Sequence, residues 1–540
     1  MSGIETPVLI VGAGPVGLAL AGDLGWRGVP CLVVERSDGS IYQPRQDFVS
    51  PRTMEFCRRW GIVDDVEASP YPRDYPQDNV YVAGGLADGW EIGRYPVPSM
   101  NDGRPPSQSP QRRERCPQNM FDPILRRFAE RFDCVELRYR HRFLGYRQSN
   151  DGVQVEIEDG GTGRTYHIAA RWLVGCDGGS SAVRAQMGVP MIGNPALTYT
   201  TNVIFRCMDF EKLHPLRPGY RFILVGPEGT WATIVAINGR DQWRFSIVKS
   251  GDNFGAPDEA TIRAAIRRAV GRDFDYEILS VVPWTRRELV AERYADGNVF
   301  IAGDAAHVVS PTGGFGMNTG VGDAVDLSWK LAARYAGWGG AHLLASYTAE
   351  RRPVAERNSK EASGNLGRML SPGRNPALLD PTDSSARLRE KVGRELSRAM
   401  MREWNTLGIH LGYFYEGSPI IVSDGTAAPP LDHATYEQTA RPGSRAPHVW
   451  LADGRSTLDQ FGRGFVLLML GDAPPEAAQL ALSAAERKLP LEIVRLNEPA
   501  VADAYRTSLV LVRPDDHVAW RGDRPPLDPA RVIDQVRGAA

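Results

Sequence analysis

Three glycines and one glutamate near the start of the chain lie at fixed spacings around two short apolar runs. Gly12, Gly14 and Gly17 form a G-x-G-x-x-G pattern directly after the run VLIV, and Glu35 ends a second run, CLVV. In this pattern the first glycine permits a tight turn, the second lets a pyrophosphate approach the backbone, and the third lets a helix pack closely on a strand. The helix N-terminus stabilises phosphate charge, and the acid accepts a ribose hydroxyl. The spacing predicts a dinucleotide site, against the alternative of a tight turn without a ligand.

Two later segments separate FAD from NAD as the nucleotide. Residues 171–184 read RWLVGCDGGSSAVR, and residues 297–331 contain GNVFIAGDAAH followed by a glycine-rich loop. With GAGPVG they form three motifs in order. The chain resembles the aromatic-ring hydroxylases, the single-component FAD monooxygenases that include phenol hydroxylase and para-hydroxybenzoate hydroxylase. The resemblance covers about residues 5–365 and implies FAD as the cofactor, with NADPH or NADH as co-substrate.

The resemblance assigns roles to residues of the third motif. It implies that Asp304, after Gly303, accepts a hydrogen bond from a ribityl hydroxyl of FAD, and that the carbonyl of Pro311 lies beside the flavin hydroperoxide. It also implies that three successive residues present backbone groups to the flavin ring: Gly316, Met317 and Asn318. A helix expected from about Asn318 to Ala336 would direct its positive end at the flavin edge where negative charge collects on reduction.

Further cofactor contacts are implied outside this motif. Asp177, in an Asp-Gly pair, matches a residue tied to both FAD and NAD(P)H, and Arg45 matches an arginine near the FAD phosphates. Gln118 resembles a glutamine that contacts the cofactor, although its surroundings, CPQNMF, match loosely. Pro15 and Arg36, which follow the second glycine and the glutamate, complete the predicted cofactor-binding set.

Asp47 is the candidate for contact with the substrate. The segment RTME at 52–55 resembles RTLE in phenol hydroxylase, so that Asp47 matches the acid facing the substrate hydroxyl there. A group that accepts the proton of a phenol makes the ring a better nucleophile. The alternative is a loop aspartate that caps a helix beginning near Ser50. Two further residues also have a structural interpretation as the alternative to a functional one. His307 would be a satisfied core histidine, and Arg184 would form a helix salt bridge.

Composition argues against several other classes of protein. A net charge of −2, with 42% hydrophobic and 24% charged residues, gives no basic excess for nucleic acid. The six cysteines form no C-x-x-C pair and the nine histidines show no ligand spacing, so no metal site is expected. No apolar stretch of about 18 residues is present that could span a membrane. The N-terminus lacks the pattern of a signal peptide, and the cytoplasm is the expected location.

The expected elements form an α/β fold in which a Rossmann-like FAD-binding domain is interleaved with a mainly β-sheet substrate domain. A C-terminal α/β domain follows. The predicted boundaries assign 1–75, 111–190 and 281–370 to the FAD-binding domain, 76–110 and 191–280 to the substrate domain, 371–439 to a linker and helical connection, and 440–540 to the C-terminal domain.

The C-terminal domain is expected to be thioredoxin-like. The runs FVLLML, LEIVRL and SLVLVRP predict three strands, with an alanine-rich helix at 475–487. Residues 407–426 and 441–451 resemble the phenol hydroxylase and dichlorophenol hydroxylase branch, which carries such a domain. No cysteine follows Cys207, which excludes dithiol chemistry there and leaves a packing or dimerisation role. A homodimer is therefore one expectation.

The cofactor determines the predicted mechanism. NAD(P)H reduces FAD, O2 adds at C4a, and the hydroperoxide transfers OH to the ring of a phenolic substrate, while the protein orients the ring and excludes water. The same machinery could carry out an epoxidation or a Baeyer–Villiger oxidation on a polyketide-type substrate. A binding protein without redox chemistry, such as a Rab GDP-dissociation inhibitor, also uses this type of fold. The flavin-ring loop at 311–320 argues against that last class.

Overall fold

A parallel sheet forms where the sequence has its short apolar runs. The computed structural model describes residues 4–249 and 257–540. Five parallel strands lie in the order β17-β10-β1-β2-β7, which are Val299–Ile301, Thr165–Gly175, Ile4–Val11, Cys31–Glu35 and Val135–Tyr139. The antiparallel strands β16 (Ala295–Asp296), β9 (Gly152–Asp159) and β8 (His141–Ser149) extend this sheet. The runs VLIV and CLVV are buried on both faces because helices cover both sides of a parallel sheet.

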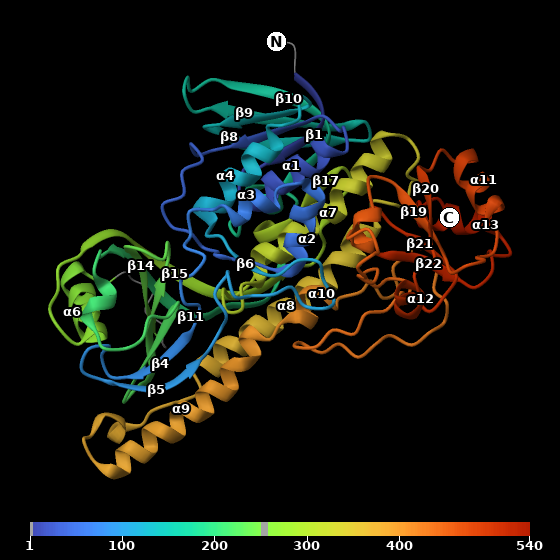
Figure 1. The fold of residues 1–540 in the computed structure, drawn as a ribbon. Helices are drawn as coiled ribbons and strands as arrows, with labels where there is room; N and C mark the ends of the chain where they lie inside the picture. Colours follow the sequence, from blue (N-terminus) through green and yellow to red (C-terminus); the bar gives the residue numbers. More distant parts are fainter. Residues whose placement is uncertain (1–3, 250–256) are drawn as a thin grey trace.

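The helices of this first unit connect and cover its strands. They are α1 (Pro15–Trp26), α2 (Pro51–Trp60), α3 (Val63–Glu67), α4 (Gln118–Ala129), α5 (Ala182–Gln186), α7 (Phe315–Tyr335) and α8 (Ser346–Met369). Helix α1 packs against both α4 and α7 (Figure 1). The helix that the sequence places from about Asn318 begins three residues earlier, at Phe315.

A second sheet of eight strands forms the other large unit. Its order is β18-β15-β11-β14-β13-β12-β4-β5, which are His307–Val308, Glu277–Ala291, Met191–Arg206, Gln242–Lys249, Gly229–Ala236, Arg221–Gly226, Asn79–Ala83 and Trp90–Tyr95. Helix α6 (Glu259–Val270) packs on one face through Ile262 and Ile266. A short antiparallel pair, β3 (Phe48–Val49) with β6 (Glu114–Arg115), lies outside the large sheets.

The segment predicted as a linker is part of the packed structure. Leu378 is fully buried in a short 3-10 turn, and α9 (Asp383–Trp404) contributes Leu396 and Met400 to the core on the second face of the large sheet. The short helix α10 (Leu407–Leu411) follows. Pro and Ser residues mark turns well, but here the apolar residues between them are buried, so the segment is not a free connection.

The C-terminal unit is a four-stranded sheet in the order β20-β19-β21-β22, which are Leu491–Leu496, Phe465–Leu470, Leu509–Val512 and Val518–Gly522. Its helices are α11 (Ala478–Glu486), α12 (Pro499–Tyr505) and α13 (Pro529–Val536). The three predicted strands and the predicted helix are confirmed, and β22 was not predicted. The unit packs on α7 (Figure 1), where Trp329 is in one apolar cluster with Phe465.

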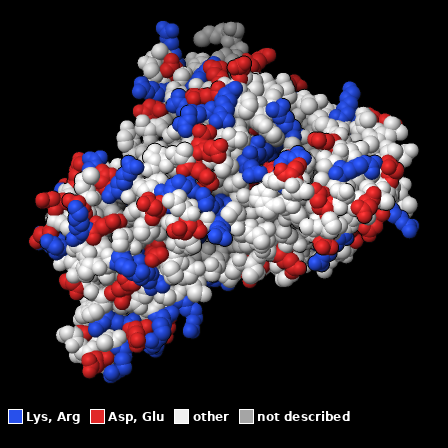
Figure 2. Space-filling view, in the orientation of Figure 1, with Lys and Arg blue, Asp and Glu red and all other residues white. Residues whose placement is uncertain are grey.

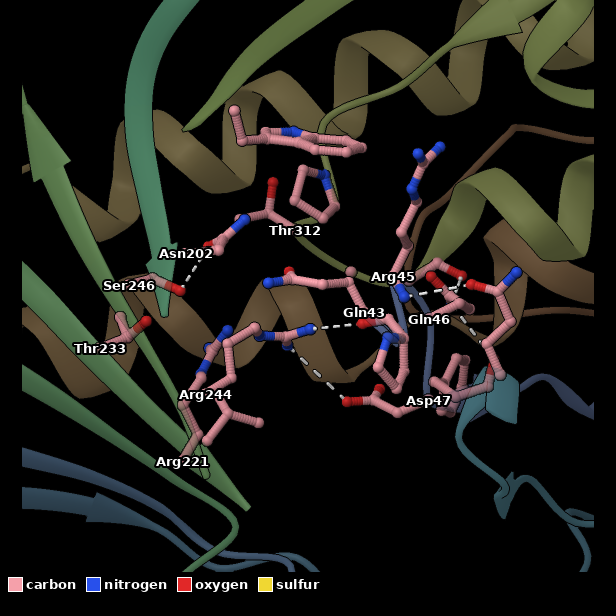
Figure 3. Close-up of a pocket in the computed structure, with 18 of the residues that line it drawn as sticks. Gln43, Arg45, Gln46, Asp47, Asn202, Arg221, Thr233, Arg244, Ser246 and Thr312 are labelled. Carbon is pink, nitrogen blue, oxygen red and sulfur yellow. Dashed lines mark hydrogen bonds and ion pairs between the residues drawn. The ribbon is translucent and has the colours of Figure 1, made fainter. Parts of the chain in front are cut away.

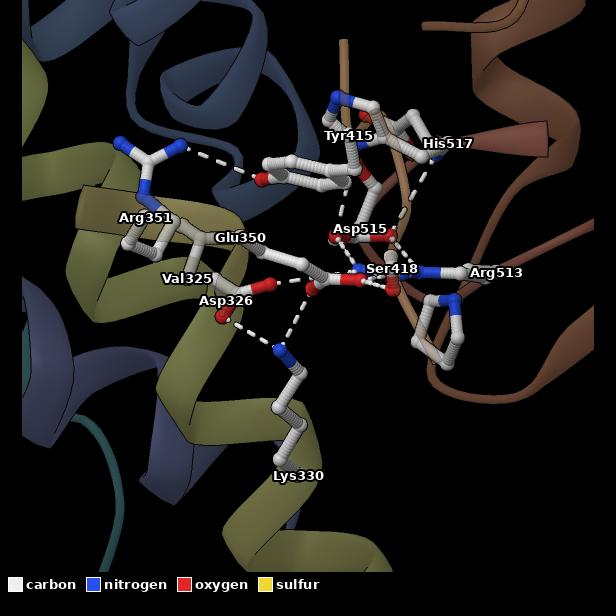
Figure 4. A network of polar contacts seen from close by, with 12 residues as sticks. Val325, Asp326, Lys330, Glu350, Arg351, Tyr415, Ser418, Arg513, Asp515 and His517 are labelled. Atoms are coloured by element: carbon white, nitrogen blue, oxygen red, sulfur yellow. Dashed lines mark hydrogen bonds and ion pairs between the residues drawn. The ribbon is translucent and has the colours of Figure 1, made fainter. Parts of the chain in front are cut away.

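A fully buried network of charges joins α7, α8 and the C-terminal unit (Figure 4). Arg513 donates to both oxygens of Glu350, at 2.5 and 2.9 Å, and to Asp515 at 2.6 Å. Lys330 donates to Asp326 at 2.7 Å and to Glu350 at 2.6 Å. Burial raises the pKa of Asp326 to about 8, whereas Arg513 and Lys330 outweigh the effect of burial on Glu350 and hold its pKa low.

The outer surface has no dominant sign of charge on the face shown in Figure 2, where basic and acidic side chains alternate. This distribution agrees with 63 basic and 65 acidic residues in the whole chain. Among the described residues, no helix combines the length and the hydropathy needed to cross a membrane.

We predict that Arg513→Met destabilises the protein strongly, because it leaves Glu350 and Asp515 buried without their main partner. Removing one member of a buried charge network typically costs about 3–5 kcal/mol. Urea denaturation followed by circular dichroism measures the loss. Arg495→Met is the matched control, because its ion pair with Glu476 is 55% and 76% exposed and such pairs contribute about 1 kcal/mol or less. Equal losses in the two variants would contradict the structural role of the network.

Candidate active site

The three glycines of the first motif occupy positions with different physical demands. Gly12 has φ +106°, and a Cβ there would lie 2.5 Å from the carbonyl oxygen of Cys176. A Cβ on Gly17 would lie 2.0 Å from the carbonyl oxygen of Gly12, so the close packing of α1 requires glycine. A Cβ on Gly14 would meet no atom within 4 Å. Gly12 and Gly17 therefore shape the turn, whereas Gly14 faces open space next to the N-terminus of α1.

Glu35 and Pro15 support the same turn. One carboxylate oxygen of Glu35 accepts from the backbone N–H of Ala13 at 3.0 Å, and the other accepts from Ser37 at 2.8 Å. Two bonds leave lone pairs for a further donor, such as a ribose hydroxyl. Pro15 takes the first position of α1, where the missing N–H has no helical partner in any case. Arg36 is exposed beside Glu35.

The start of α7 and the Gly303-Asp304 turn face each other. A Cβ on Gly316 would have an oxygen of Asp304 as its nearest neighbour, at 4.0 Å. Gly314 is the residue before α7 and has no side chain to accept from the first-turn N–H groups. The backbone of Gly316 and Met317 therefore lies in a helix end without a side-chain cap. Burial raises the pKa of Asp304, against the opposing charges of His307 and Arg45.

The side chain of Asn318 holds this helix end in place. Its oxygen accepts from the Ser50 N–H at 2.9 Å and from the Thr53 hydroxyl at 2.7 Å. Its amide nitrogen donates to the carbonyls of Phe48 and Gly314. The sequence predicted only a backbone role for Asn318, and the structure adds this bridge between α7 and the 48–53 segment.

Asp177 binds within the second motif, whereas Arg184 connects this motif to the turn of the third. Asp177 accepts from the Ser181 hydroxyl and from the Ala182 N–H at 2.7 Å, at the start of α5. Arg184 donates to the carbonyl of Ala305 at 2.7 Å and to that of Gly179 at 2.9 Å. The prediction of a helix salt bridge for Arg184 is wrong, because its guanidinium binds backbone carbonyls and so ties the second motif to the third.

His307 is held inside the protein. It is fully buried, and its Nε2 lies 2.7 Å from an oxygen of Asp323 on α7. The N–H of Gly303 donates to the same oxygen at 3.2 Å, and Arg351 donates to the other oxygen at 2.8 Å. The bond of Nε2 supports a structural role for His307, but its Nδ1 is buried without a hydrogen-bond partner among the described residues, so the ring is not fully satisfied.

Arg45 and Gln118 meet at the edge of the cavity. The backbone N–H of Arg45 donates to the side-chain oxygen of Gln118 at 3.1 Å, and its guanidinium lies 5.0 Å from the ring centre of Trp284. The amide nitrogen of Gln118 donates to Asp122 at 3.1 Å. Asp122 is buried on α4, and burial raises its pKa to about 8 although the bond from Gln118 opposes the shift. The carboxyl is therefore largely protonated at neutral pH.

A cavity of about 460 Å3 lies between the 40–48 segment, the second face of the large sheet and the loop at 311–314 (Figure 3). Strand alternation explains its lining: Trp243 and Phe245 face α6, so Arg244 and Ser246 face the cavity. In Figure 3 Arg244 extends from the sheet toward Asp47 on the opposite segment.

Asp47 is held by three residues from distant parts of the chain. Arg115 donates to one oxygen at 2.8 Å, the Tyr220 hydroxyl donates to the other, and Arg244 lies 4.0 Å away. Burial alone would raise the pKa of Asp47, but Arg115 and Arg244 outweigh it and the pKa is lowered. The capping alternative is wrong, because the Ser50 hydroxyl accepts from the Thr53 N–H at the start of α2. Asp47 is thus an anion at the cavity wall.

The loop after Pro311 forms the opposite side of the cavity. The Pro311 carbonyl accepts from the Gly314 N–H at 3.1 Å within a turn. The Gly313 N–H donates to Glu403 of α9 at 3.1 Å, and Glu403 also binds Arg221 through both oxygens at 3.0 and 2.7 Å. A residue of the predicted linker and helical connection, on its helix α9, therefore lines the cavity.

Sequence reasoning missed five cavity residues that bind or surround the acids: Arg115, Tyr220, Arg221, Arg244 and Glu403. The alternation in QWRFSIVK could have indicated which residues of β14 face the cavity. No local pattern marks the partners of Asp47, because Tyr220 is 173 positions away from it.

The residues present fit an FAD. An open space at Gly14, two uncapped helix N-termini and an acid at the Gly303-Asp304 turn are the features that a pyrophosphate, a ribityl chain and an electron-rich ring edge require. All three motifs contribute to this one region of the structure.

Comparison with known proteins agrees with this arrangement. The FAD binding domain model matches residues 5–362, and the aromatic-ring hydroxylase C-terminal model matches residues 439–540. The chain is 35% identical to tetracenomycin B2 monooxygenase-dioxygenase of Streptomyces olivaceus, over 99% of this chain and 98% of that one. It is 31% identical to 2,4-dichlorophenol 6-monooxygenase of Delftia acidovorans, over 96% and 95%. The rebeccamycin biosynthetic enzyme RebC with reduced flavin superposes with a TM-score of 0.92 at 39% identity, covering all of both chains.

We predict that Gly14→Val abolishes FAD binding without unfolding the protein. Gly14 has φ −76°, which valine tolerates, but the new side chain would fill the space expected for the pyrophosphate. The purified variant should be folded by circular dichroism and nearly free of flavin absorbance. Gly17→Val is the contrasting variant, and it should lose stability because its Cβ overlaps the Gly12 carbonyl. Full FAD occupancy in Gly14→Val would show that the pyrophosphate lies elsewhere.

We predict that Asp122→Asn increases stability at alkaline pH. An unfolded chain ionises this carboxyl near 3.8, whereas the folded protein keeps its proton up to about 8. Between these values unfolding releases a proton, so the wild-type protein loses stability as pH rises, by up to about 1.4 kcal/mol per pH unit. Asparagine removes that dependence. Urea denaturation at pH 5 and pH 8 measures the free energy of unfolding of both proteins. If the wild-type protein and the variant differ by the same free energy at both pH values, a buried, protonated Asp122 is contradicted.

Proposed function

This chain belongs to the FAD-dependent aromatic-ring hydroxylases, and on that premise we propose that it hydroxylates a phenolic compound with NAD(P)H and O2. The observation that carries the proposal is the half-buried, anionic Asp47 at the wall of the cavity. Bound FAD would supply the reduction by NAD(P)H and the activation of O2, held at the glycine turn, at Asp304 and at the start of α7.

Asp47 is proposed to accept a hydrogen bond from the substrate hydroxyl. A carboxylate has about four lone-pair sites, and Arg115 and Tyr220 use one each, so a further donor can bind. The lowered pKa makes Asp47 a weak base, and full transfer of a phenolic proton, whose ordinary pKa is about 10, is uphill. The bond instead strengthens as phenolate character develops, which stabilises the transition state more than the ground state.

The neighbours of Asp47 are proposed to keep it ionised and fixed. Arg115 lies 3.7 Å from the ring centre of Tyr220 and pairs with Asp47, so three side chains fix one geometry. Burial raises the pKa of the Tyr220 hydroxyl, which therefore stays a donor. Rigid support of this kind orients a substrate ring toward the flavin.

A polyketide-type substrate is the second candidate, with hydroxylation, epoxidation or Baeyer–Villiger oxidation as the reaction. A relative with 35% identity over nearly the full chain is tetracenomycin B2 monooxygenase-dioxygenase. The two candidates share the cofactor site and differ in the ring system that the cavity receives.

We predict that Asp47→Asn retains FAD and its reduction but loses at least about tenfold in hydroxylation, because a charged hydrogen bond is worth about 1.5–3 kcal/mol. A panel of phenols and polycyclic phenols, with NAD(P)H oxidation and product formation measured together, tests this. The reducing equivalents should appear as hydrogen peroxide.

Asp241→Asn is the matched control, since Asp241 pairs with Arg206 in the same sheet unit outside the cavity. It should hydroxylate at the wild-type rate. An unchanged hydroxylation rate in Asp47→Asn, with the same amount of product per NAD(P)H oxidised, would contradict the substrate-binding role. The absence of any hydroxylated product from the whole panel would contradict the proposed function.

A further inference from the structure

The segment that carries Asp47 lines the cavity and is held from the start of α4 by three hydrogen bonds. The Cys116 N–H donates to the Asp47 carbonyl at 2.9 Å, one residue pair beyond the short β3–β6 ladder. The Gln118 N–H donates to the Gln46 carbonyl at 2.8 Å. The third bond runs from the Arg45 N–H to the side-chain oxygen of Gln118, at 3.1 Å. The Gln118 side chain thus continues the line of backbone bonds and takes the place of a strand neighbour.

This third bond depends on how the Gln118 amide is turned. The oxygen and the nitrogen of a glutamine amide exchange places when the group rotates by half a turn, and only the oxygen accepts. Because the Arg45 N–H is a donor, the oxygen must face it, and the nitrogen then needs an acceptor of its own. Asp122 lies one turn further along α4 and supplies this acceptor, since Gln118 Nε2 donates to its carboxyl at 3.1 Å.

Asp122 is unfavourable at its position for stability alone. It is 5% exposed, and its second carboxyl oxygen has no hydrogen-bond partner among the described residues. Burial raises its pKa to about 8, and Gln118 is the one group that opposes this shift. The titratable groups nearby are the Cys116 thiol and the Tyr139 hydroxyl, whose pKa values are raised, so both are neutral and neither is a cation that could pair with it.

A buried polar group with an unpaired oxygen costs free energy that an apolar residue would not. Departures of this kind from good packing are expected at functional sites. Two observations on Asp122 therefore agree: its position is unfavourable for the core, and its one hydrogen bond goes to a side chain that lines the cavity.

We propose that Asp122 is a positioning residue of the cofactor site and acts through Gln118. Its carboxyl fixes the orientation of the amide, the amide oxygen holds the Arg45 N–H, and the segment that leads to Asp47 keeps its place (Figure 3). The amide nitrogen of Gln118 has a second N–H, for which the described residues supply no acceptor, and FAD can receive it. The inference goes beyond the proposed function, because it requires FAD but no particular substrate.

Release of FAD on dilution of the holoenzyme, measured by flavin fluorescence, tests the role of Asp122. Asp122→Ala should raise the Kd of FAD about 3- to 10-fold, as expected for the loss of one hydrogen bond. Asp122→Asn should stay within about twofold of the wild-type Kd, because its amide oxygen can accept the same bond from Gln118. An unchanged Kd in Asp122→Ala would overturn the proposal, and so would an equal increase in both variants.

A double-mutant cycle tests whether Asp122 acts through Gln118. Gln118→Leu should itself raise the Kd of FAD. In that background Asp122→Ala should add less than about twofold, because the amide that it orients is gone. Two effects that multiply in the double variant would show that Asp122 acts independently of Gln118 and would overturn the proposal.

Urea denaturation of the same holoenzymes separates positioning from stabilisation of α4. Asp122→Ala has no buried carboxyl to ionise, so it should gain stability relative to the wild-type protein between pH 5 and pH 8. At pH 8 the variant should therefore be at least as stable as the wild type and yet bind FAD more weakly. A variant that is less stable at both pH values, and whose FAD affinity falls only for that reason, would show a role in helix stability alone.

The chain offers a matched control for each substitution. The side chain of Gln186 also binds backbone groups, the N–H and the carbonyl of Tyr146 at 3.0 and 2.7 Å, but lies outside the cavity lining. Glu130 is an acid directly after α4 whose side chain is 43% exposed. Gln186→Leu and Glu130→Ala should leave the Kd of FAD unchanged, and increases as large as those of the site variants would overturn the proposal.

The outcomes also separate this role from the proposed function. The expected coupling between Asp122 and Gln118, with no phenol of the panel hydroxylated, would support the positioning role and refute the hydroxylation. Hydroxylation of phenols by an enzyme whose FAD affinity does not depend on Asp122 would support the hydroxylation and refute the positioning role.

Discussion

The buried carboxylate of Asp323, in the middle of α7, is the constraint on which the site depends. It receives the Gly303 N–H, the His307 ring and the Arg351 guanidinium, and it is fully buried. A buried charge without these bonds would cost several kcal/mol, so helix and turn are fixed relative to each other. Asp304 and the uncapped start of α7 consequently face one common space.

The same helix makes the C-terminal unit part of the enzyme. Its far half carries Asp326, Lys330 and Trp329, which meet Arg513 and the apolar cluster of the C-terminal sheet. The C-terminal unit contains no cysteine and so has no dithiol chemistry. Instead, its Arg513 contacts the C-terminal half of α7, the helix that begins at the predicted flavin site. Its contribution is thus to rigidity, which orientation-dependent chemistry requires.

Electrostatics inside the cavity explains why Asp47 is kept ionised at its wall. Burial penalises the anion of Asp47, yet two arginines reverse the effect, and the acid is kept as a charged acceptor.

The sequence by itself determined the glycine turn, the strands around it, the Gly303-Asp304 motif and the general position of α7, because each depends on residues within about 35 positions of one another. It failed where neighbours in space are distant in the chain. Arg184 binds the distant carbonyl of Ala305 rather than an acid, and α9 supplies Glu403 to the cavity. Only the tertiary structure brought Tyr220 and Arg115 to Asp47, because the pairing of charged and polar groups is a property of the folded volume and not of any local run of residues.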